Sequence, residues 1–404
     1  MSYSSIQLNK RKIIFQVFCG RWEQANVTQH PGKVFQELAK YDWGALKATL
    51  QVTHVYLLGV WQNSGPILVQ KENDLDISKN KNRCPSPFAV SQHTLPNPLL
   101  GTNEEFRELI RLIHNSHLSV LVDFVPNHTG MTHPWVSEKP EYYKKNKNQE
   151  IQTAFSGDVA ELNYENETLC KEMNTVLEAV AAFGVDGVRA DMAHLIPMFF
   201  WKDAIQQLRV THPGFLFLAE AYGTSVFDLE TQENLMDVGF DAIYDEPLYK
   251  NIKAYGNGGS LSDVMGHFNY VNKHRAHNWM HYVSNHDDTF PLDASKAEIW
   301  QAIVLLLPGW HLLYNGTLQG FEGRLAHHII DIMVEAHTKP STLSQTLKNW
   351  FEWIGSENPL CEVFEQVGEE EIVIHWRGVL HSGVALFNLK LGVYEAKING
   401  NNSR

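Results

Sequence analysis

The stretch FGVDGVRADMAH, residues 183–194, has the pattern of a short apolar strand that ends in charged and polar side chains. Successive side chains of a strand point to opposite faces, so Arg189 and Asp191 are expected to point the same way. A salt bridge that only closes the end of a strand would explain this pair, and so would a functional site. The rest of the sequence has to distinguish the two interpretations.

Short β-rich runs recur along the chain, separated by stretches whose apolar residues have helical spacing. Eight strand-then-helix units predict an α/β fold, a parallel (β/α)8 TIM barrel. An open doubly wound sheet is the alternative, but no Gly-rich phosphate loop follows the first run. The candidate strands are residues 12–18, 53–60, 119–127, 185–191, 215–221, 238–245, 279–287 and 310–316, and helical spacing recurs at 32–51, 103–117, 167–184, 199–209 and 297–307.

Two stretches depart from this repeat. Residues 129–166 are polar, dotted with aromatic side chains and poor in helical pattern, which predicts a small inserted domain at the rim after the third strand. Residues 356–404 carry alternating runs separated by glycine turns, which predicts a short C-terminal antiparallel β domain. The catalytic barrel is then expected to comprise residues 1–128 and 167–355.

The overall charge limits the possible partners. The 404 residues include 46 acidic and 33 basic side chains, a formal net charge of -13. Such an excess repels phosphate backbones and anionic membranes, so we expect neither nucleic acid nor membrane partners. The apolar run Ile13–Cys19 is too short for a signal-peptide core with its cleavage site, so we expect a cytoplasmic protein. The sequence does not indicate an oligomeric state.

Reactive side chains gather at the ends of four predicted strands, where barrel enzymes place their chemistry. Three carboxylates that converge from different strands repel one another, which lowers the stability of the protein. Such a cluster is therefore expected where a function requires it. Arg189 is then the cation that keeps Asp191 ionised, and a functional site explains the pair better than a structural salt bridge does. The residues at these strand ends are Asp123, Asn127 and His128; Arg189, Asp191 and His194; Glu220; and Asn285, His286 and Asp287.

Two nearby carboxyl groups with separated pKa values are what retaining glycoside cleavage requires. We expect Asp191 to attack the anomeric carbon and Glu220 to protonate the departing oxygen. Glu220 follows the apolar run FLFLA, and burial beside other anions should raise its pKa. Asp287, with His128 and His286, is expected to bond the ring hydroxyls of a distorted sugar.

Four motifs resemble, in order, the signature regions of the alpha-amylase superfamily, glycoside hydrolase family 13. They are DFVPNH at 123–128, GVRAD at 187–191, the Glu of FLAEA at 217–221, and YVSNHD at 282–287, with PLLGT at 98–102 and LPGWHLLYNG at 307–316 in support. The resemblance implies a catalytic TIM barrel, an inserted domain after strand three, a C-terminal β domain and retaining chemistry on α-glucosidic bonds. It implies that Asp191 is the nucleophile, Glu220 the acid/base and Asp287 the third essential carboxylate.

The sequence departs from the family pattern at several positions. Phe88 stands where many relatives carry a sugar-stacking Tyr, His194 where many carry a Lys that contacts the next sugar unit, and Leu318 where many carry an acidic residue. Trp61 is expected to offer another aromatic face to a sugar. The predicted substrate-binding residues are Arg189, His128, His286, Asp123, Asn285, Phe88, His194 and Trp61.

A structural calcium ion is a further implication of the resemblance, whereas the chemistry itself needs no cofactor. Asn127, with Asp158 or Glu161, occupies positions that bind calcium in many amylases, and oxygen ligands of this kind suit the ion. Asn127 could instead hydrogen-bond the loop, and several branches of the family lack the ion.

We therefore expect a retaining hydrolase that cleaves α-1,4 bonds of maltooligosaccharides or glycogen- and starch-like glucans. A transglycosylase or α-glucoside isomerase of the same family, and a glucan-binding paralogue without catalysis, are alternatives. A metal-dependent hydrolase that uses His128, His286, Asp123 and Asp191 as ligands is a poorer interpretation, because the first strand offers no His-x-His pair.

Overall fold

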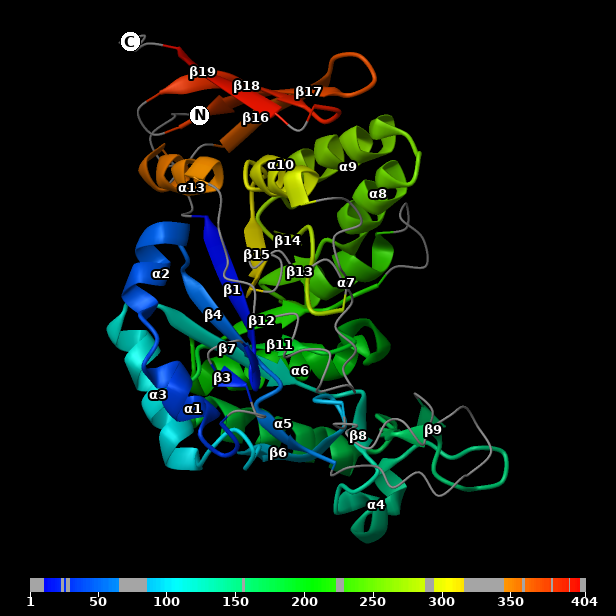
Figure 1. The fold of residues 1–404 in the computed structure, drawn as a ribbon. Coiled ribbons are helices and arrows are strands. Elements are labelled where there is room, and N and C mark those ends of the chain that lie inside the picture. Colours follow the sequence, from blue (N-terminus) through cyan, green and yellow to red (C-terminus); the bar gives the residue numbers. More distant parts are fainter. Residues whose placement is uncertain are drawn as a thin grey trace, which may run out of the picture.

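Eight parallel strands form a closed barrel in the computed structural model (Figure 1). The structure describes residues 11–22, 25–26, 30–64, 86–154, 157–222, 229–287, 294–315, 345–357, 360–378, 381–391 and 393–399. The last barrel strand pairs with the first, with Lys12 opposite Trp310, which confirms the TIM barrel and excludes the open sheet. In chain order the strands are β1 (Lys12–Phe18), β4 (His54–Leu58), β7 (Ser119–Phe124), β11 (Gly187–Ala190), β12 (Leu216–Ala219), β13 (Ala242–Tyr244), β14 (Trp279–His281) and β15 (Trp310–Tyr314).

Helices surround the barrel, and their apolar faces pack on it. In the helix that leads into β7, Phe106, Leu109 and Ile110 are buried at helical spacing, and Thr102 forms a capping box with Glu105 that fixes the helix start. The expected helical stretch 32–51 is divided into two helices, the second of which is capped by Asp42. The helices are α1 (Val34–Ala39), α2 (Trp43–Leu50), α3 (Asn103–Asn115), α5 (Glu167–Ala181), α6 (Met198–Thr211), α7 (Glu230–Val238), α8 (Glu246–Gly256), α9 (Leu261–Lys273), α10 (Ala294–Val304) and α13 (Gln345–Glu357).

Alternation along the strands separates two cores. Ile14, Tyr56, Leu121, Met280 and Leu312 belong to a cluster that fills the barrel, whereas their neighbours in sequence pack outward against the helices. Because every second residue faces inward, side chains at the carboxyl ends of the strands lie above this filled interior. The packed interior therefore lies below the functional site, and the barrel is not a channel.

Two excursions leave the barrel beyond its strand ends. After β7 the chain forms β8 (His128–Gly130), α4 (Trp135–Glu138), the 3-10 turn η2 (Pro140–Tyr142), β9 (Thr153–Ala154) and β10 (Val159–Glu161), with the strands in the order β8-β10-β9. The second excursion, which the sequence analysis did not predict, pairs β5 (Trp61–Asn63) with β6 (Val90–Pro96) after β4. The two excursions touch at Gly130, where an added Cβ would lie 2.5 Å from the Ala89 carbonyl oxygen.

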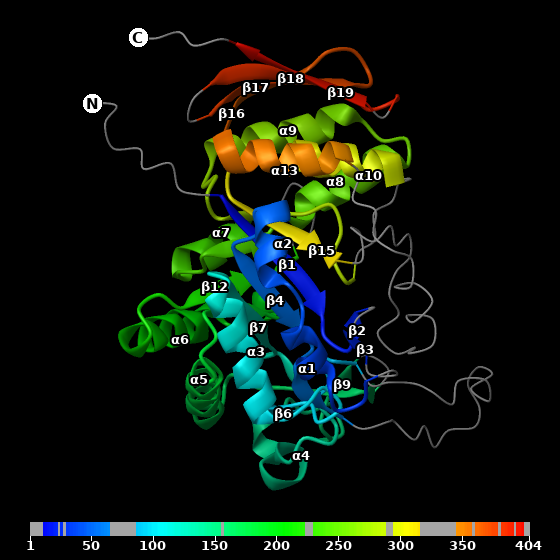
Figure 2. The same ribbon diagram turned by 60° about the vertical axis from the view of Figure 1, so that its left-hand side comes forward.

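The C-terminal part of the chain forms the expected antiparallel sheet. It consists of β16 (Leu360–Gln366), β17 (Glu371–Arg377), β18 (Ser382–Asn388) and β19 (Val393–Asn399), paired in that order. Figures 1 and 2 show it stacked over α9, α10 and α13, near the start of β1, while β8 and α4 lie at the opposite end of the molecule. The domain boundaries at 128/129, 166/167 and 355/356 stay predictions. Of the helices that the structure describes, none has the length and apolar character needed to cross a bilayer.

Candidate active site

The carboxyl ends of β7, β11, β12 and β14 bring charged side chains together around one guanidinium. Arg189, only 1% exposed, has its Nη1 atom 2.6 Å from Asp191 Oδ1 and its Nη2 atom 2.5 Å from Glu220 Oε1. The register of β11 and β12 pairs Ala190 with Ala219, which places the two carboxylates level with each other. The Arg–Asp pair of the opening stretch is therefore a salt bridge, and it is also shared with a carboxylate from the next strand.

Burial and charge act in opposite directions on these carboxyl groups. Burial raises the pKa of Asp191 and of Glu220 above the ordinary values, and the guanidinium of Arg189 opposes that rise. Asp287 raises both pKa values further through like-charge repulsion. The site thus holds carboxyl groups that can keep or accept a proton nearer to neutrality than exposed ones.

Backbone geometry directs a further donor at Glu220. Met192, the residue after Asp191, has a φ of +45°, a left-handed conformation that non-glycine residues seldom adopt. Its N–H donates to Glu220 Oε2 at 2.7 Å, so the strained turn is used to hold the second carboxylate oxygen. The hydroxyl of Tyr222 donates to the other oxygen at 2.7 Å.

Both carboxylate oxygens of Asp123, on β7, accept hydrogen bonds from the protein. Tyr56 Oη donates to its Oδ1 atom, and the Gly59 N–H donates to its Oδ2 atom at 2.7 Å. Burial raises the pKa of Asp123 to about 6. Asp123 is 2% exposed and binds residues at the end of β4, so its contact with a substrate stays a prediction.

Asp287 is the most accessible of the site carboxylates, with 25% of its side chain exposed. Its backbone N–H donates to Asn285 Oδ1 at 2.8 Å, and its Oδ2 atom lies 3.1 Å from His286 Nε2. The other ring nitrogen of His286 pairs with Gln16 Nε2 at 2.9 Å. Sequence reasoning missed Gln16, although a polar residue on the inward face of the otherwise apolar β1 was a usable signal.

Aromatic side chains flank Arg189. The ring centroid of Phe88 lies 5.4 Å from the guanidinium carbon and 5.5 Å from the ring of His286. Tyr244, which the sequence analysis did not single out, lies 5.6 Å from the same guanidinium carbon. Phe88 is thus at the site and remains a candidate for sugar stacking.

Trp61 is not at the mouth of the barrel. It is 2% exposed, its ring packs against Phe106 at 6.0 Å and Phe183 at 5.6 Å, and its Nε1–H donates to the Asp123 carbonyl at 2.6 Å. This placement corrects the prediction that Trp61 contacts a sugar. Neither face is available, because the residue belongs to the core between the barrel and α3.

The two histidines of the predicted set differ in surroundings. His128 on β8 is buried, and burial lowers its pKa to about 4, which keeps its ring neutral at pH 7. His194 lies in the 3-10 turn η4 (Ala193–Leu195), where its half-buried ring meets that of Tyr222 edge-on at 5.5 Å. Leu318 lies outside the described residues.

Of the expected calcium ligands, Glu161 already binds other side chains. Lys144 Nζ lies 3.2 Å from Glu161 Oε2, and Gln152 Nε2 donates to Oε1 at 3.1 Å, so both oxygens already have donors. Asn127 directs its amide nitrogen at His128 Nδ1 at 3.2 Å. Within the ranges that the structure describes, no three His, Cys, Asp or Glu side chains are grouped as a metal site.

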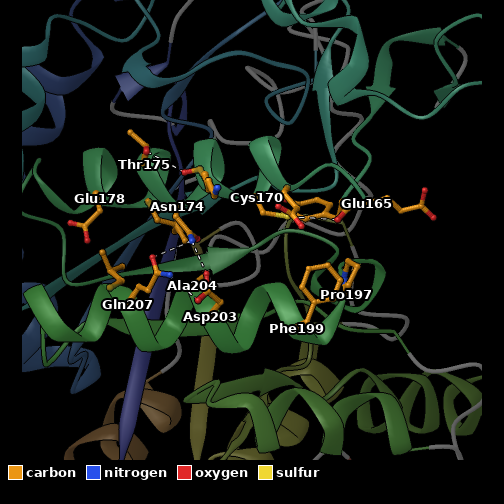
Figure 3. Close-up of a pocket in the computed structure, with 15 residues that line it drawn as sticks. Glu165, Cys170, Asn174, Thr175, Glu178, Pro197, Phe199, Asp203, Ala204 and Gln207 are labelled. Atoms are coloured by element: carbon orange, nitrogen blue, oxygen red, sulfur yellow. Dashed lines mark hydrogen bonds between the residues drawn. The ribbon is translucent and has the colours of Figure 1, made fainter.

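A groove of about 740 Å³ lies elsewhere, between α5 and α6. Figure 3 shows Asn174 of α5 facing Asp203 and Gln207 of α6, to which its Nδ2 atom donates at 3.0 and 3.4 Å. Phe199, 61% exposed, lines one end. None of the site carboxylates lines this groove, so it is separate from the candidate active site.

Fold and site together define a TIM-barrel protein with a buried Arg–Asp–Glu cluster at the carboxyl ends of its strands. Residues 66–153 match the family model described as "Alpha amylase, catalytic domain". An alpha-amylase of Haloarcula japonica is 29% identical over 242 residues, which are 56% of this chain and 35% of that protein. A cyclomaltodextrin glucanotransferase of Thermoanaerobacterium thermosulfurigenes is 22% identical over 77% of this chain and 50% of its own length.

Solved structures agree with the fold. A noncanonic maltogenic alpha-amylase from Thermotoga neapolitana has a TM-score of 0.75 at 22% identity, covering 95% of this chain and 87% of that one. An alpha-amylase from Lactobacillus plantarum has the same TM-score and identity, covering 94% and 88%. Over residues 66–153 the chain therefore resembles the alpha-amylase catalytic domain, and it shares the barrel fold of the solved alpha-amylases. Its match spans about a third to a half of the two sequence relatives described above.

Proposed function

We propose that this protein is a retaining α-glucan hydrolase that cleaves α-1,4 bonds of maltooligosaccharides or of glycogen- and starch-like polymers. The observation that carries the proposal is the single guanidinium of Arg189 shared by Asp191 and Glu220. A shared cation keeps the two carboxyl groups close, and retaining enzymes need a separation of about 5 Å where inverting ones need more. The names of the relatives support the substrate class.

In the first step Asp191 attacks the anomeric carbon while Glu220 gives its proton to the leaving glucosyl oxygen. The C–O bond to the leaving sugar breaks as the bond to Asp191 Oδ forms. In the second step Glu220, now ionised, takes a proton from water, and the hydroxide oxygen displaces Asp191. The exposed face of Asp287 and the ring of Phe88 bind the sugar.

A time course with maltoheptaose tests the proposal, with products separated by length and anomeric form. Release of shorter α-anomeric sugars is expected from the wild type and, because the nucleophile is gone, at least a hundredfold more slowly from Asp191→Asn. Asp203→Asn in the α5–α6 groove is the matched control and should keep wild-type rates. Products of β configuration, or an Asp191→Asn variant as active as the control, would refute it.

Transfer to a sugar acceptor is the second candidate function. A cyclomaltodextrin glucanotransferase is among the relatives, and transferase and hydrolase share the glycosyl-enzyme step. Products longer than maltoheptaose in the same time course would identify the transferase. Binding of maltoheptaose without any turnover would indicate a glucan-binding paralogue.

Metal independence is part of the same proposal. Because Glu161 already faces Lys144 and Gln152, removal of divalent ions should not disturb the fold or the chemistry. We expect EDTA to leave both the turnover rate and the Tm unchanged. A fall in Tm that calcium restores would instead establish the structural calcium site at Asn127, Asp158 and Glu161.

A further inference from the structure

Tyr222 contacts the proposed acid/base directly. Its hydroxyl donates to Glu220 Oε1 at 2.7 Å, the same oxygen that lies 2.5 Å from Arg189 Nη2. The Met192 N–H holds the other oxygen at 2.7 Å. Beside the ion pair with Arg189, the carboxyl group therefore accepts one hydrogen bond from a side chain, the phenol, and one from the backbone.

The position of Tyr222 is determined by its neighbours. It follows β12, two residues after Glu220, and its half-buried ring meets His194 of η4 edge-on at 5.5 Å. Burial, followed by the charge of Glu220, raises the pKa of Tyr222 well above its usual value. The phenol consequently stays protonated and remains a donor throughout the working pH range of a glycosidase.

A donor to a carboxylate favours the ionised form, whereas burial favours the protonated one. Glu220 must be protonated in the first step and ionised in the second, so its donors set the balance between the two steps. The other charged or titratable side chains that act on Glu220 come from several elements: Asp123 of β7, His128 of β8, Arg189 of β11, Asp191 after β11, His194 of η4, Tyr244 of β13 and Asp287 after β14.

We infer that Tyr222 is a positioning residue whose hydroxyl holds Glu220 in the orientation and protonation balance that proton transfer to the leaving sugar requires. The inference deepens the proposed function and rests on it. Tyr222 acts through Glu220 and needs no contact with the sugar. The effect of the Tyr222 hydroxyl on the reaction rate should therefore depend on pH and on how strongly the leaving group requires protonation.

Tyr222→Phe removes the hydroxyl and keeps the ring against His194. Loss of one hydrogen bond to a charged group should raise the pKa of Glu220, which moves the alkaline limb of the kcat/KM profile on maltoheptaose up by about one pH unit. Tyr255→Phe is the matched control, because Tyr255 Oη donates to Glu370 Oε2 at 2.6 Å away from the site. That control should leave the profile unchanged.

An activated substrate separates this role from a general loss of structure. Fluoride leaves α-maltosyl fluoride with little need of an acid, so Tyr222→Phe should lower kcat/KM for maltoheptaose at optimal pH about tenfold more than for the fluoride. Equal losses on both substrates, or a pH profile that overlays that of the wild type, would overturn the inference. A wild type that turns over neither substrate would contradict the proposed function instead.

Discussion

At the scale of single residues, the site is organised around one buried arginine. Arg189 neutralises Asp191 and Glu220, and the rings of Phe88 and Tyr244 flank its guanidinium. Only a planar group with two outward N–H edges can serve two carboxylates from adjacent strands in this way. The identity of this residue should therefore matter beyond its charge.

Arg189→Lys tests that point. Lysine keeps the positive charge but offers a single ammonium, which cannot hold both carboxylates in place. We expect kcat on maltoheptaose to fall by roughly a hundredfold, about 2.7 kcal/mol in activation free energy, while the protein remains folded. Turnover and Tm measured together check this, and a kcat within twofold of the wild type would contradict it.

At the scale of elements, Asp245 joins four of them. It follows β13 and caps α8 through the Leu248 N–H at 3.2 Å, and it pairs with His267 Nε2 of α9 at 2.6 Å and His281 Nδ1 of β14 at 2.7 Å. His281 Nε2 also lies 2.9 Å from the Pro308 carbonyl oxygen, so both of its nitrogens face acceptors. Asp245, His267 and His281 therefore form one buried hydrogen-bonded cluster.

Burial acts to raise the pKa of Asp245, but the two imidazoles outweigh it and hold that pKa well below its usual value. A depressed folded-state pKa contributes stability that is present above the unfolded pKa of about 3.9 and lost as pH falls below it.

Asp245→Asn should lower the free energy of unfolding by about 3–5 kcal/mol at pH 7, because an amide cannot accept all the buried hydrogen bonds that the carboxylate shares with Leu248, His267 and His281. Urea unfolding at pH 7, 5 and 3.5 should show that the difference in unfolding free energy between the variant and the wild type is smaller at pH 3.5. The exposed Asp237, paired with Arg275, is the control, and Asp237→Asn should cost less than about 1 kcal/mol. If that difference is the same at all three pH values, the depressed pKa of Asp245 does not contribute to stability.

At the scale of the whole molecule, the C-terminal sheet covers the end of the barrel opposite to the excursions (Figure 2). Phe364 of β16, 4% exposed, packs against Phe268 of α9 with ring centroids 4.9 Å apart. The Cys361 N–H also bonds to the Leu306 carbonyl at 3.3 Å. These contacts make the sheet a support for the helices and keep it away from the carboxylates.

Phe364→Ala should therefore reduce stability without changing the chemistry. Removal of a buried aromatic ring is expected to cost about 3–5 kcal/mol of unfolding free energy, whereas kcat/KM per folded molecule stays at the wild-type value. Val363→Ala, on the exposed face of the same strand, should cost less than about 1 kcal/mol. A specific loss of kcat/KM in Phe364→Ala would show that the sheet acts on the site.

The sequence predicted the barrel because its signal is repetitive: eight candidate strands recur with helical spacing between many of them, and each repeat supports the others. It also located the candidate carboxylates, since a charged residue directly after an apolar strand can be recognised from the sequence alone. It misjudged Trp61, because a side chain at a strand end can face the mouth of the barrel or the layer of helices behind it. It missed the β5–β6 excursion, whose short strands carry little periodicity.

By itself the sequence determined which residue types end each strand, because those depend on spacing along the chain. The tertiary structure alone decided which of them meet. Arg189 reaches Glu220 because β11 and β12 pair in one register, Tyr222 meets His194 because the end of β12 lies beside η4, and Gln16 reaches His286 because the barrel closes. Contacts between strands depend on the register in which the strands pair and on the closure of the barrel. Neither can be predicted from the local sequence of one strand.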